Sequence, residues 1–418
     1  MEILSVGEKI KRARIYKRLT LKDICNEKIS VSKMSCIENG KIDPDDYILE
    51  FLSKKLDVSI DYLKYDTKKQ FMDNLKKFGD IEKAKKEEYL KYNMYYANQY
   101  KYHDIAFEFL HILFNYYLDN NKIDSTRELS SEYYDICRKT KANNAKLIYY
   151  MDMGRYLFCS EEYSQSANYY RIINNYIEQN KIKENDIKIK SIYYEAQAYI
   201  MLGSYNKAYK IAKKLIDYVD EAKSDLERAK IYNINLFLSV KMDDINFFKF
   251  KRDGEKYFEI NSKVKAQFMY NHGIKLLKED KIDEAKELIT NAMRLFPNNG
   301  NIKYSYFITD LINNLINSKD VTKYESLCDE ILNYSIDINN YLIIENAYYL
   351  KAKIFDKIGN KISFEMCMSL SLDFLLKLNN NERLYNRYLE MGKLYADINN
   401  IKESIKYFNL AIKLSKKI

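Results

Sequence analysis

The sequence is poor in the residues that end or bend secondary structure. Its 418 residues include 10 glycines, 2 prolines and no tryptophan. Sandwiches of β-strands and doubly wound sheets need many tight turns, and most such turns use glycine or proline. The shortage therefore excludes those architectures and predicts an all-α protein.

Metal-binding and membrane-spanning patterns are also missing from the sequence. The six cysteines are scattered without a C-x-x-C pair, and no histidine stands at ligand spacing from them. We therefore expect reduced thiols, no metal and no cofactor. The chain has no apolar leader and no run of 18 apolar residues, so we expect a cytoplasmic protein that does not enter the membrane.

Nothing in the sequence favours catalysis. The three histidines, His103, His111 and His272, fall in separate predicted helices without a nucleophile or carboxylate motif beside them. No glycine-rich phosphate loop is present. The sequence therefore predicts a binding or regulatory protein and not an enzyme.

Charge is distributed unevenly at the start of the chain. Residues 1–41 contain ten Lys or Arg against five Asp or Glu, whereas residues 42–66 contain three against seven. A basic surface on one side of a small domain is typical of a phosphate-binding face. A solvated charged surface is the alternative interpretation if charge is taken alone.

Start and stop signals predict five short helices within residues 1–66. The first covers Val6 to Lys17, and the second covers residues 21–27 after a Thr20–Asp23 capping box. Ser30 is expected to cap the third helix, which Gly40 ends. The fourth is expected to have Asp43 as its cap and Pro44 at its first position, and Ser59 is expected to cap the fifth. Short helices with a tight turn between the second and third predict a helix-turn-helix domain.

The third helix of this domain has an apolar face and a polar face. Met34 and Ile37 are expected to pack on Ile10 and Ile24. Small side chains on the other face would let the helix enter the DNA major groove, where Lys33 could reach a base or a phosphate. The predicted DNA-contacting residues are Thr20, Ser30, Val31, Ser32, Lys33, Ser35, Cys36 and Lys41.

Residues 6–64 resemble the Cro/repressor-type helix-turn-helix family. The resemblance rests on Gly7, Ile10, Arg14, Leu19–Thr20, Ile24–Cys25 and the segment "SxxxxSxIENGK". It implies a buried clamp between Arg14 and Glu38. The chain departs from the family at Leu21, where a DNA-contacting glutamine is usual, and this departure concerns base preference.

The rest of the chain contains internal repeats. The segment from Met269 to Pro297 has Gly273, Ala285, Ala292 and Pro297 at the small and turn positions of a tetratricopeptide unit of about 34 residues. Three more segments show the same pattern, around Gly154 with Ser166, Ala196 with Ala208, and Gly392 with Ser404. Such small residues are expected where the two helices of a unit approach closest.

Longer and weaker units are predicted at 107–140, 229–260, 304–336 and 345–378. Residues 67–104 are assigned to connecting helices, and 105–418 to a repeat domain for peptide binding and dimerisation. Stacked units of this kind form a right-handed superhelix, whose concave wall consists of the first helix of each unit. Amide and aromatic side chains on that wall could bracket an extended peptide, and Arg155 could hold a carboxylate.

The positions that face the predicted groove include His111, Ile148, Phe158, Lys353 and Lys393. The residues predicted to bind peptide are Asn115, Arg155, Tyr193, Gln197, Asn233, Gln267, Tyr270 and Asn346.

A helix-turn-helix domain joined to such repeats resembles the RRNPP group of peptide-responsive regulators. The segment "CNEKISVSKMSCIENGK" carries much of the likeness. The resemblance implies a homodimer that binds a double-stranded operator and a short quorum-sensing peptide. It also implies control of sporulation, toxin or other stationary-phase genes.

Two alternatives remain open at this point. One is an adaptor that holds a protein of a sporulation phosphorelay through the repeat groove. The other is a phosphatase of the Rap type, which the same repeats could support, although no acidic or amide residue that would position a water molecule for it emerges from the sequence.

Overall fold

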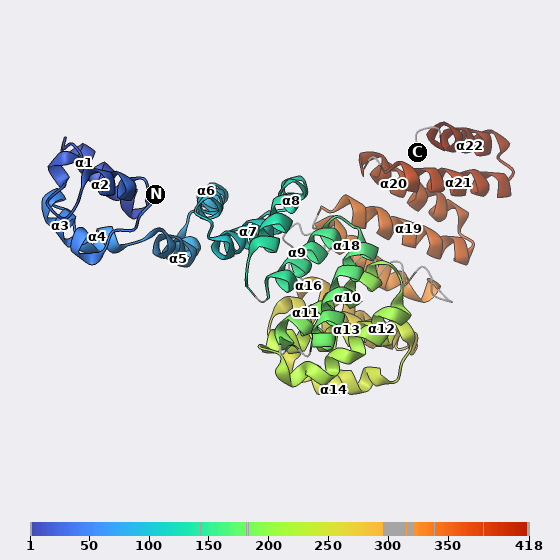
Figure 1. Cartoon of the computed structure of the whole chain (residues 1–418). Helices are drawn as coiled ribbons and strands as arrows, with labels where there is room; N and C mark the ends of the chain where they lie inside the picture. Colours follow the sequence, from blue (N-terminus) through green and yellow to red (C-terminus); the bar gives the residue numbers. More distant parts are fainter. Residues whose placement is uncertain are drawn as a thin grey trace. The chain divides into compact units, whose positions relative to one another are not determined.

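The computed structural model divides the chain into two compact units, Met1–Ser204 and Tyr205–Ile418, which are described separately. The structure describes residues 2–142, 144–180, 182, 184–295, 315, 321–337, 339–378 and 380–415. Among these residues all regular secondary structure is helical (Figure 1). The one β-type pairing among them is an isolated bridge between Asn26 and Ile29. The all-α prediction is confirmed.

The first unit begins with a small N-terminal head, residues 5–65. Its elements are α1 (Val6–Tyr16), the 3-10 turn η1 (Lys22–Ile24), α2 (Val31–Glu38), α3 (Asp46–Leu56) and α4 (Ile60–Lys64). Ser30 and Ser59 cap α2 and α4 as expected, and Gly40 has a φ of 67° after the end of α2. The head has its own apolar core, which includes Ile10, Ile24, Met34, Ile37 and Leu52.

Two details of the head differ from the sequence prediction. Residues 21–27 do not form an α-helix, because the side chain of Asn26 accepts a hydrogen bond from Lys28 N and turns the chain after η1. The cap of α3 is Asp45 and not Asp43. Its Oδ1 accepts from Ile48 N at 2.9 Å, so Pro44 precedes the helix.

A close approach of α1 to the end of α2 fixes the shape of the head. A Cβ atom on Gly7 would lie 2.2 Å from the carbonyl oxygen of Ile37. No other residue type fits there without moving the backbone. Gly7 therefore sets the distance between these two helices.

Antiparallel helix pairs build the rest of the first unit. The helices, in chain order, are α5 (Thr67–Lys77), α6 (Lys86–Gln99), α7 (His103–Asp119), α8 (Ile123–Lys139), α9 (Ala145–Cys159), α10 (Tyr163–Asn180) and α11 (Asn185–Met201). Short 3-10 turns η2 (Phe78–Asp80) and η3 (Lys83–Lys85) separate α5 from α6. Residues 107–140 are a helix pair, as expected.

The second unit continues the same construction. Its described helices are α12 (Tyr205–Lys213), the 3-10 segment η4 (Lys214–Glu221), α13 (Asp225–Met242), α14 (Asn246–Phe258), α15 (Ser262–Lys278), α16 (Ile282–Leu295), the 3-10 turn η5 (Val321–Tyr324), α18 (Glu325–Asp337), α19 (Tyr341–Ile358), α20 (Lys361–Leu378), α21 (Asn381–Asp397) and α22 (Ile401–Ser415). The predicted pairs at 229–260 and 345–378 are present. Pro297 and about half of the predicted unit, residues 304–314 and 316–320, lie outside the described residues.

Each turn inside a helix pair has the same backbone geometry. One residue takes a left-handed conformation, and the next amide donates to a carbonyl five residues earlier, as when Glu162 N donates to Leu157 O. Glycine occupies only two of these turns. The left-handed residues are Lys101, Asn121, Glu161, Gly203, Asp243, Asp280, Gly359 and Asn399. Asn, Asp and charged residues thus replace glycine, which is how a chain so poor in glycine makes so many turns.

The small residues of the repeats lie where the two helices touch. A Cβ atom on Gly154 would lie 2.8 Å from the ring of Tyr170, and one on Gly392 would lie 2.7 Å from the ring of Phe408. Ser166 Oγ donates to Gly154 O at 2.8 Å, and Ser404 Oγ donates to Gly392 O at the same distance. Two repeats far apart in sequence therefore share one packing device.

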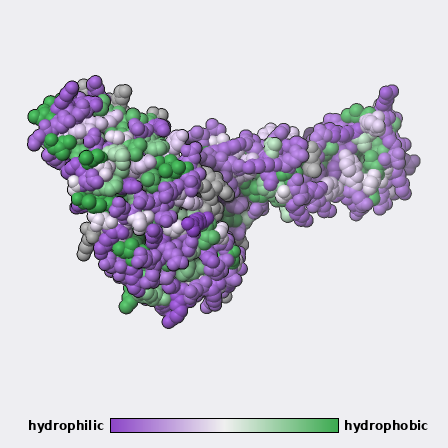
Figure 2. Space-filling model, turned by 180° about the vertical axis from the view of Figure 1, so that it is seen from behind, coloured by the Kyte–Doolittle hydropathy of each residue, from purple (hydrophilic) through white to green (hydrophobic). Residues whose placement is uncertain are grey.

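Hydrophilic residues cover much of the face shown in Figure 2, with apolar residues scattered between them. Among the described residues, no helix combines the length and the apolar character needed to cross a membrane.

The contact at Gly154 predicts a loss of stability on substitution. Gly154→Ala should destabilise the first unit by about 1 kcal/mol, because overpacking against buried Tyr170 outweighs the gain in helix propensity. Urea unfolding followed by circular dichroism measures the change, and hydrogen exchange of α9 and α10 assigns it to this pair. Gly79→Ala is the control, since a Cβ atom there meets nothing within 4 Å. Equal stability of the two variants would contradict the packing argument.

Candidate functional site

The outer face of α2 is the candidate nucleic-acid interface. Ser30 Oγ accepts from Lys33 N at 3.2 Å, so the helix begins with its first residues projecting from the head. Val31 is 39% exposed, and Ser32 is exposed as well. Lys33 is half-buried, with Nζ 3.9 Å from Asp45 Oδ2. An exposed pair at this distance holds the lysine weakly, so Lys33 is available to a phosphate.

The other predicted DNA-contacting residues lie around this face. Lys41 is exposed, whereas Ser35 and Cys36 are half-buried. Thr20 is exposed but engaged, since its backbone N and its Oγ1 both donate to Asp23 Oδ2, at 2.6 and 2.7 Å. The group is therefore gathered on one head, and Thr20, Ser30, Val31, Ser32 and Lys41 are its exposed members.

Arg14 and Glu38 form the ion pair that the resemblance implies. Arg14 Nε donates to Glu38 Oε1 at 2.6 Å and Nη2 donates to Oε2 at 2.9 Å. Nη1 donates to Leu19 O at 2.9 Å, and Glu38 is buried. The hydrogen bond to Glu38 raises the pKa of Arg14. This bidentate pair fixes α1 to the end of α2 and so holds the candidate face in place.

A second candidate site lies among α7, α8 and α9, around the buried carboxylate of Asp152. Oδ2 accepts from His111 Nδ1 at 2.6 Å and from Tyr133 OH at 2.5 Å, while Oδ1 accepts from Asn115 Nδ2 at 2.9 Å. Three helices thus contribute to one polar network. The sequence did not indicate Asp152 as the partner of His111, because Asp152 lies 41 residues further along the chain.

Arg155 extends this network towards solvent. Its Nη1 donates to Asn115 Oδ1 at 2.6 Å, and its Nη2 donates to Asp119 Oδ1 at 2.5 Å. The Arg155 side chain is 39% exposed and that of Asp119 is 63% exposed. Asn115 and Arg155 therefore sit together, as the groove prediction requires. A carboxylate from a ligand could replace the weakly held Asp119.

On α11, Tyr193 and Gln197 form a local pair. Gln197 Nε2 donates to Tyr193 OH at 2.9 Å, and both side chains are half-buried. The Gln197 carbonyl oxygen is not engaged in this bond. These two residues can therefore present an acceptor to a ligand amide.

The predicted peptide contacts in the second unit are mostly buried. Asn233 donates through Nδ2 to Val264 O at 3.2 Å, between α13 and α15. Tyr270 and Asn346 are each 5% exposed, whereas Gln267 is half-buried. Asn233, Tyr270 and Asn346 pack between helices, so the expectation that they line an open groove does not hold.

A buried carboxylate that the sequence analysis did not single out organises α19, α20 and α21. Glu345 accepts from Ser371 Oγ at 2.8 Å, from Arg387 Nη2 at 3.1 Å and from Arg383 Nη1 at 3.3 Å. Arg383 Nη1 also donates to Asn346 Oδ1 at 3.0 Å. The only sequence signal was a lone carboxylate inside an apolar run, "YLIIENAYYL", and Asp152 in "YYMDMGRY" has the same signal.

Solved structures share the fold of this chain. The apo form of the quorum sensor NprR from B. thuringiensis matches with a TM-score of 0.51 at 14% identity, over 84% of this chain and 99% of its own. The apo form of RapI matches with a TM-score of 0.53 at 11% identity, over 84% and 97% of the two chains. The chain therefore shares its all-α helical-repeat fold with these two proteins. No family model and no curated protein sequence matches it.

Identity this low establishes the fold and not the function. The all-α helical-repeat fold that the resemblance implies is confirmed, whereas the helix-turn-helix assignment of residues 1–66 stays a prediction. The residues that would bind DNA or peptide remain predictions, and their support comes from the geometry of the two candidate sites.

The His111–Asp152 pair predicts a pH dependence of stability. Burial lowers the pKa of His111, but the hydrogen bond and charge of Asp152 outweigh burial and raise it above its ordinary value of 6.5. The pair should therefore stabilise the first unit fully below pH 6.5 and lose this effect as pH rises through the raised pKa. Urea unfolding at several pH values should show this loss in the wild type and a smaller one in His111→Gln.

His272 provides a control of opposite sign. Burial and nearby Lys251 lower the pKa of His272 to about 4. Stability that depends on His272 should therefore fall as pH drops from 6.5 towards 4, and His272→Gln should reduce that fall. Identical pH profiles for both variants and the wild type would refute the assignment of either histidine.

Proposed function

We propose that the protein is a DNA-binding transcriptional regulator whose repeats bind a short signalling peptide. The observation that carries the proposal is the head, where a bidentate Arg14–Glu38 pair supports a capped helix with small, exposed residues at its start. An α-helix with small side chains fits the width of the major groove. Lys33 in its first turn and Lys41 just beyond its end are positioned for phosphates of the duplex.

Peptide binding is proposed for the polar residues of the first unit. Asn115, Arg155, Tyr193 and Gln197 lie on the first helices of successive pairs and are not fully buried. Amide groups can pair with the backbone of an extended peptide, and Arg155 can pair with a carboxylate. NprR, a neighbour in fold, is a quorum sensor. This agrees with a peptide signal for the present chain.

A homodimer is part of the proposal. Each head offers one candidate reading helix, and one such helix contacts one half-site of an operator. Two-fold symmetry of two copies would match an operator with two half-sites. Sporulation, toxin or other stationary-phase genes are the proposed targets.

DNA binding can be tested with a pool of random-sequence duplexes, from which full-length protein should select a preferred one. Lys33→Ala should weaken binding to that duplex and lower the slope of log affinity against log salt by about 1, because one phosphate contact is lost. Gel shifts at several salt concentrations give both quantities. The control is Lys402→Ala, an exposed lysine on α22 in the other unit. If the wild type selects no duplex, DNA binding is wrong and an adaptor role is favoured.

Peptide binding can be tested with a pool of short synthetic peptides captured on the immobilised full-length protein. Asn115→Ala or Arg155→Ala should lower the affinity for a captured peptide about tenfold, which is roughly 1.4 kcal/mol of binding free energy, as measured by calorimetry. Asn175→Ala on α10 is the matched control, because Asn175 is an exposed asparagine on a second helix of a pair. Unchanged affinity in both variants would show that the peptide does not bind at Asn115 and Arg155.

A further inference from the structure

The N-terminal arm, residues 2–4, does not belong to the core of the head that it precedes. Ile3 is 4% exposed and packs in the apolar cluster of the connecting helices and first repeat, with Phe71, Leu90 and Met94. The head core begins only with residues such as Ile10. Ile3 therefore packs with the connecting helices and the first repeat, whereas Ile10, seven residues later, packs in the core of the head.

The side chain of Gln70 on α5 bonds both the backbone N–H and the backbone carbonyl of Leu4 in this arm. Its Oε1 accepts from Leu4 N at 3.2 Å, and its Nε2 donates to Leu4 O at 2.9 Å. The same Nε2 donates to Tyr65 O at 3.0 Å, at the end of α4. Gln70 is buried. One side chain thus joins the start of the chain to the end of the head.

Two tyrosines, Tyr92 on α6 and Tyr100 directly after its end, hold the arm and the start of α1. Tyr92 OH accepts from Ile3 N at 3.4 Å, and Tyr100 OH donates to Glu8 Oε2 at 2.8 Å. Glu8 Oε2 also accepts from Ser5 N at 2.7 Å in the capping box of α1. The cap of the first head helix is therefore bonded to the end of α6.

A lysine inside the head completes the connection. Lys9 is buried, and its Nζ donates to Tyr62 O at 2.8 Å and to Tyr65 O. These carbonyls lie in and just after α4, where the helix dipole favours a positive charge. Because Tyr65 O also bonds Gln70, α1, α4 and α5 meet at one point.

We infer that the N-terminal arm is a clasp that fixes the head to α5 and α6, so that a movement of these helices is passed on to the reading face. A head attached only through residues 65–67 could pivot about a single connection. Attachment through the arm as well gives two separated points and removes that freedom. The consequence for regulation rests on the proposed function, whereas the joint itself can be measured without DNA.

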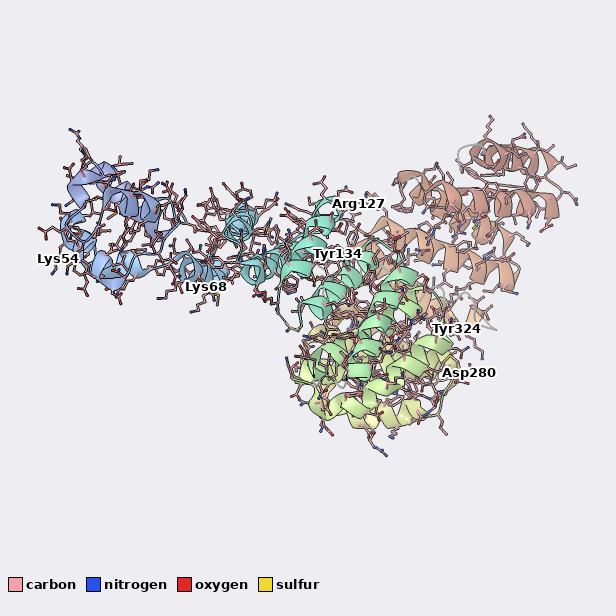
Figure 3. All side chains as sticks on the ribbon, viewed as in Figure 1. Lys54, Lys68, Arg127, Tyr134, Asp280 and Tyr324 are labelled. Carbon is pink, nitrogen blue, oxygen red and sulfur yellow. The ribbon has the colours of Figure 1, made fainter. Side chains whose placement is uncertain are left out.

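The test measures how rigidly the head is held in the full-length protein. A ketone-bearing amino acid at positions 54 and 127 accepts spin labels without altering the six cysteines. Both positions are exposed, on α3 and α8 of the same unit (Figure 3). The distance distribution between the labels should be narrow in the wild type. The double variant Ile3→Ser, Gln70→Ala should broaden it by about twofold, because the apolar anchor of the arm and its Gln70 hydrogen bonds are lost.

The matched control is Ile15→Ser with Gln99→Ala. Ile15 is 57% exposed on α1, and Gln99 is exposed at the end of α6, so this pair changes the same residue types outside the clasp. The control distribution should equal that of the wild type. Broadening in the clasp variant alone supports the inference, and an unchanged width there overturns it.

A milder variant covers the case in which the double variant misfolds. Gln70→Ala alone removes the acceptor of the Leu4 amide, so that amide should exchange with solvent about tenfold faster, while Gln99→Ala leaves it unchanged. Equal exchange rates at Leu4 would also overturn the clasp. Failure to bind DNA with the clasp intact would reject only the proposed function, so the two ideas fail separately.

Discussion

Close approach of paired helices is the constraint on which the rest of this structure depends. Two helix backbones come together only where a side chain is nearly absent, and here Gly7, Gly154, Gly273 and Gly392 provide those places. In the head, the contact at Gly7 brings α1 against α2, so that Arg14 can reach Glu38. In the repeats, each of these glycines leaves room for a side chain of the partner helix, which is Tyr170, Ile289 or Phe408. The polar residues of the two candidate sites are held in position because these contacts are short.

The sequence predicts the framework of the repeats well, because the glycine contacts of the repeats recur with a periodic spacing. Gly154 with Ser166 and Gly392 with Ser404 show equal spacing, and they make equal hydrogen bonds. Local competition between backbone and side chain is harder to foresee. The residues after η1 look helical by composition, yet the Asn26 side chain turns the chain there. Asp43 and Asp45 are equally good caps by residue type, and only the geometry after Pro44 selects Asp45.

The candidate peptide site was predictable only in part, because residue type does not reveal a distant partner. Asn115 and Asn233 have the same side chain on equivalent helices. Asn115 meets Arg155 near solvent, whereas Asn233 is enclosed between α13 and α15. Asp152 and Glu345 were missed for the same reason, since their partners lie tens of residues away and carry no periodic pattern. A single carboxylate within an apolar run is the signal that could have indicated both.

The buried networks and the clasp together provide a route by which ligand binding in the repeats would change the position of the head. A buried carboxylate such as Asp152 is stable only while its partners remain in place, so its helices keep one arrangement. A ligand that draws Asn115 or Arg155 away must replace those bonds or shift α7 against α9. α7 packs directly on α6, where Tyr92 and, directly after its end, Tyr100 hold the N-terminal arm and the start of α1. A displacement at the polar network therefore has a short, continuous path of packed helices to the face of α2.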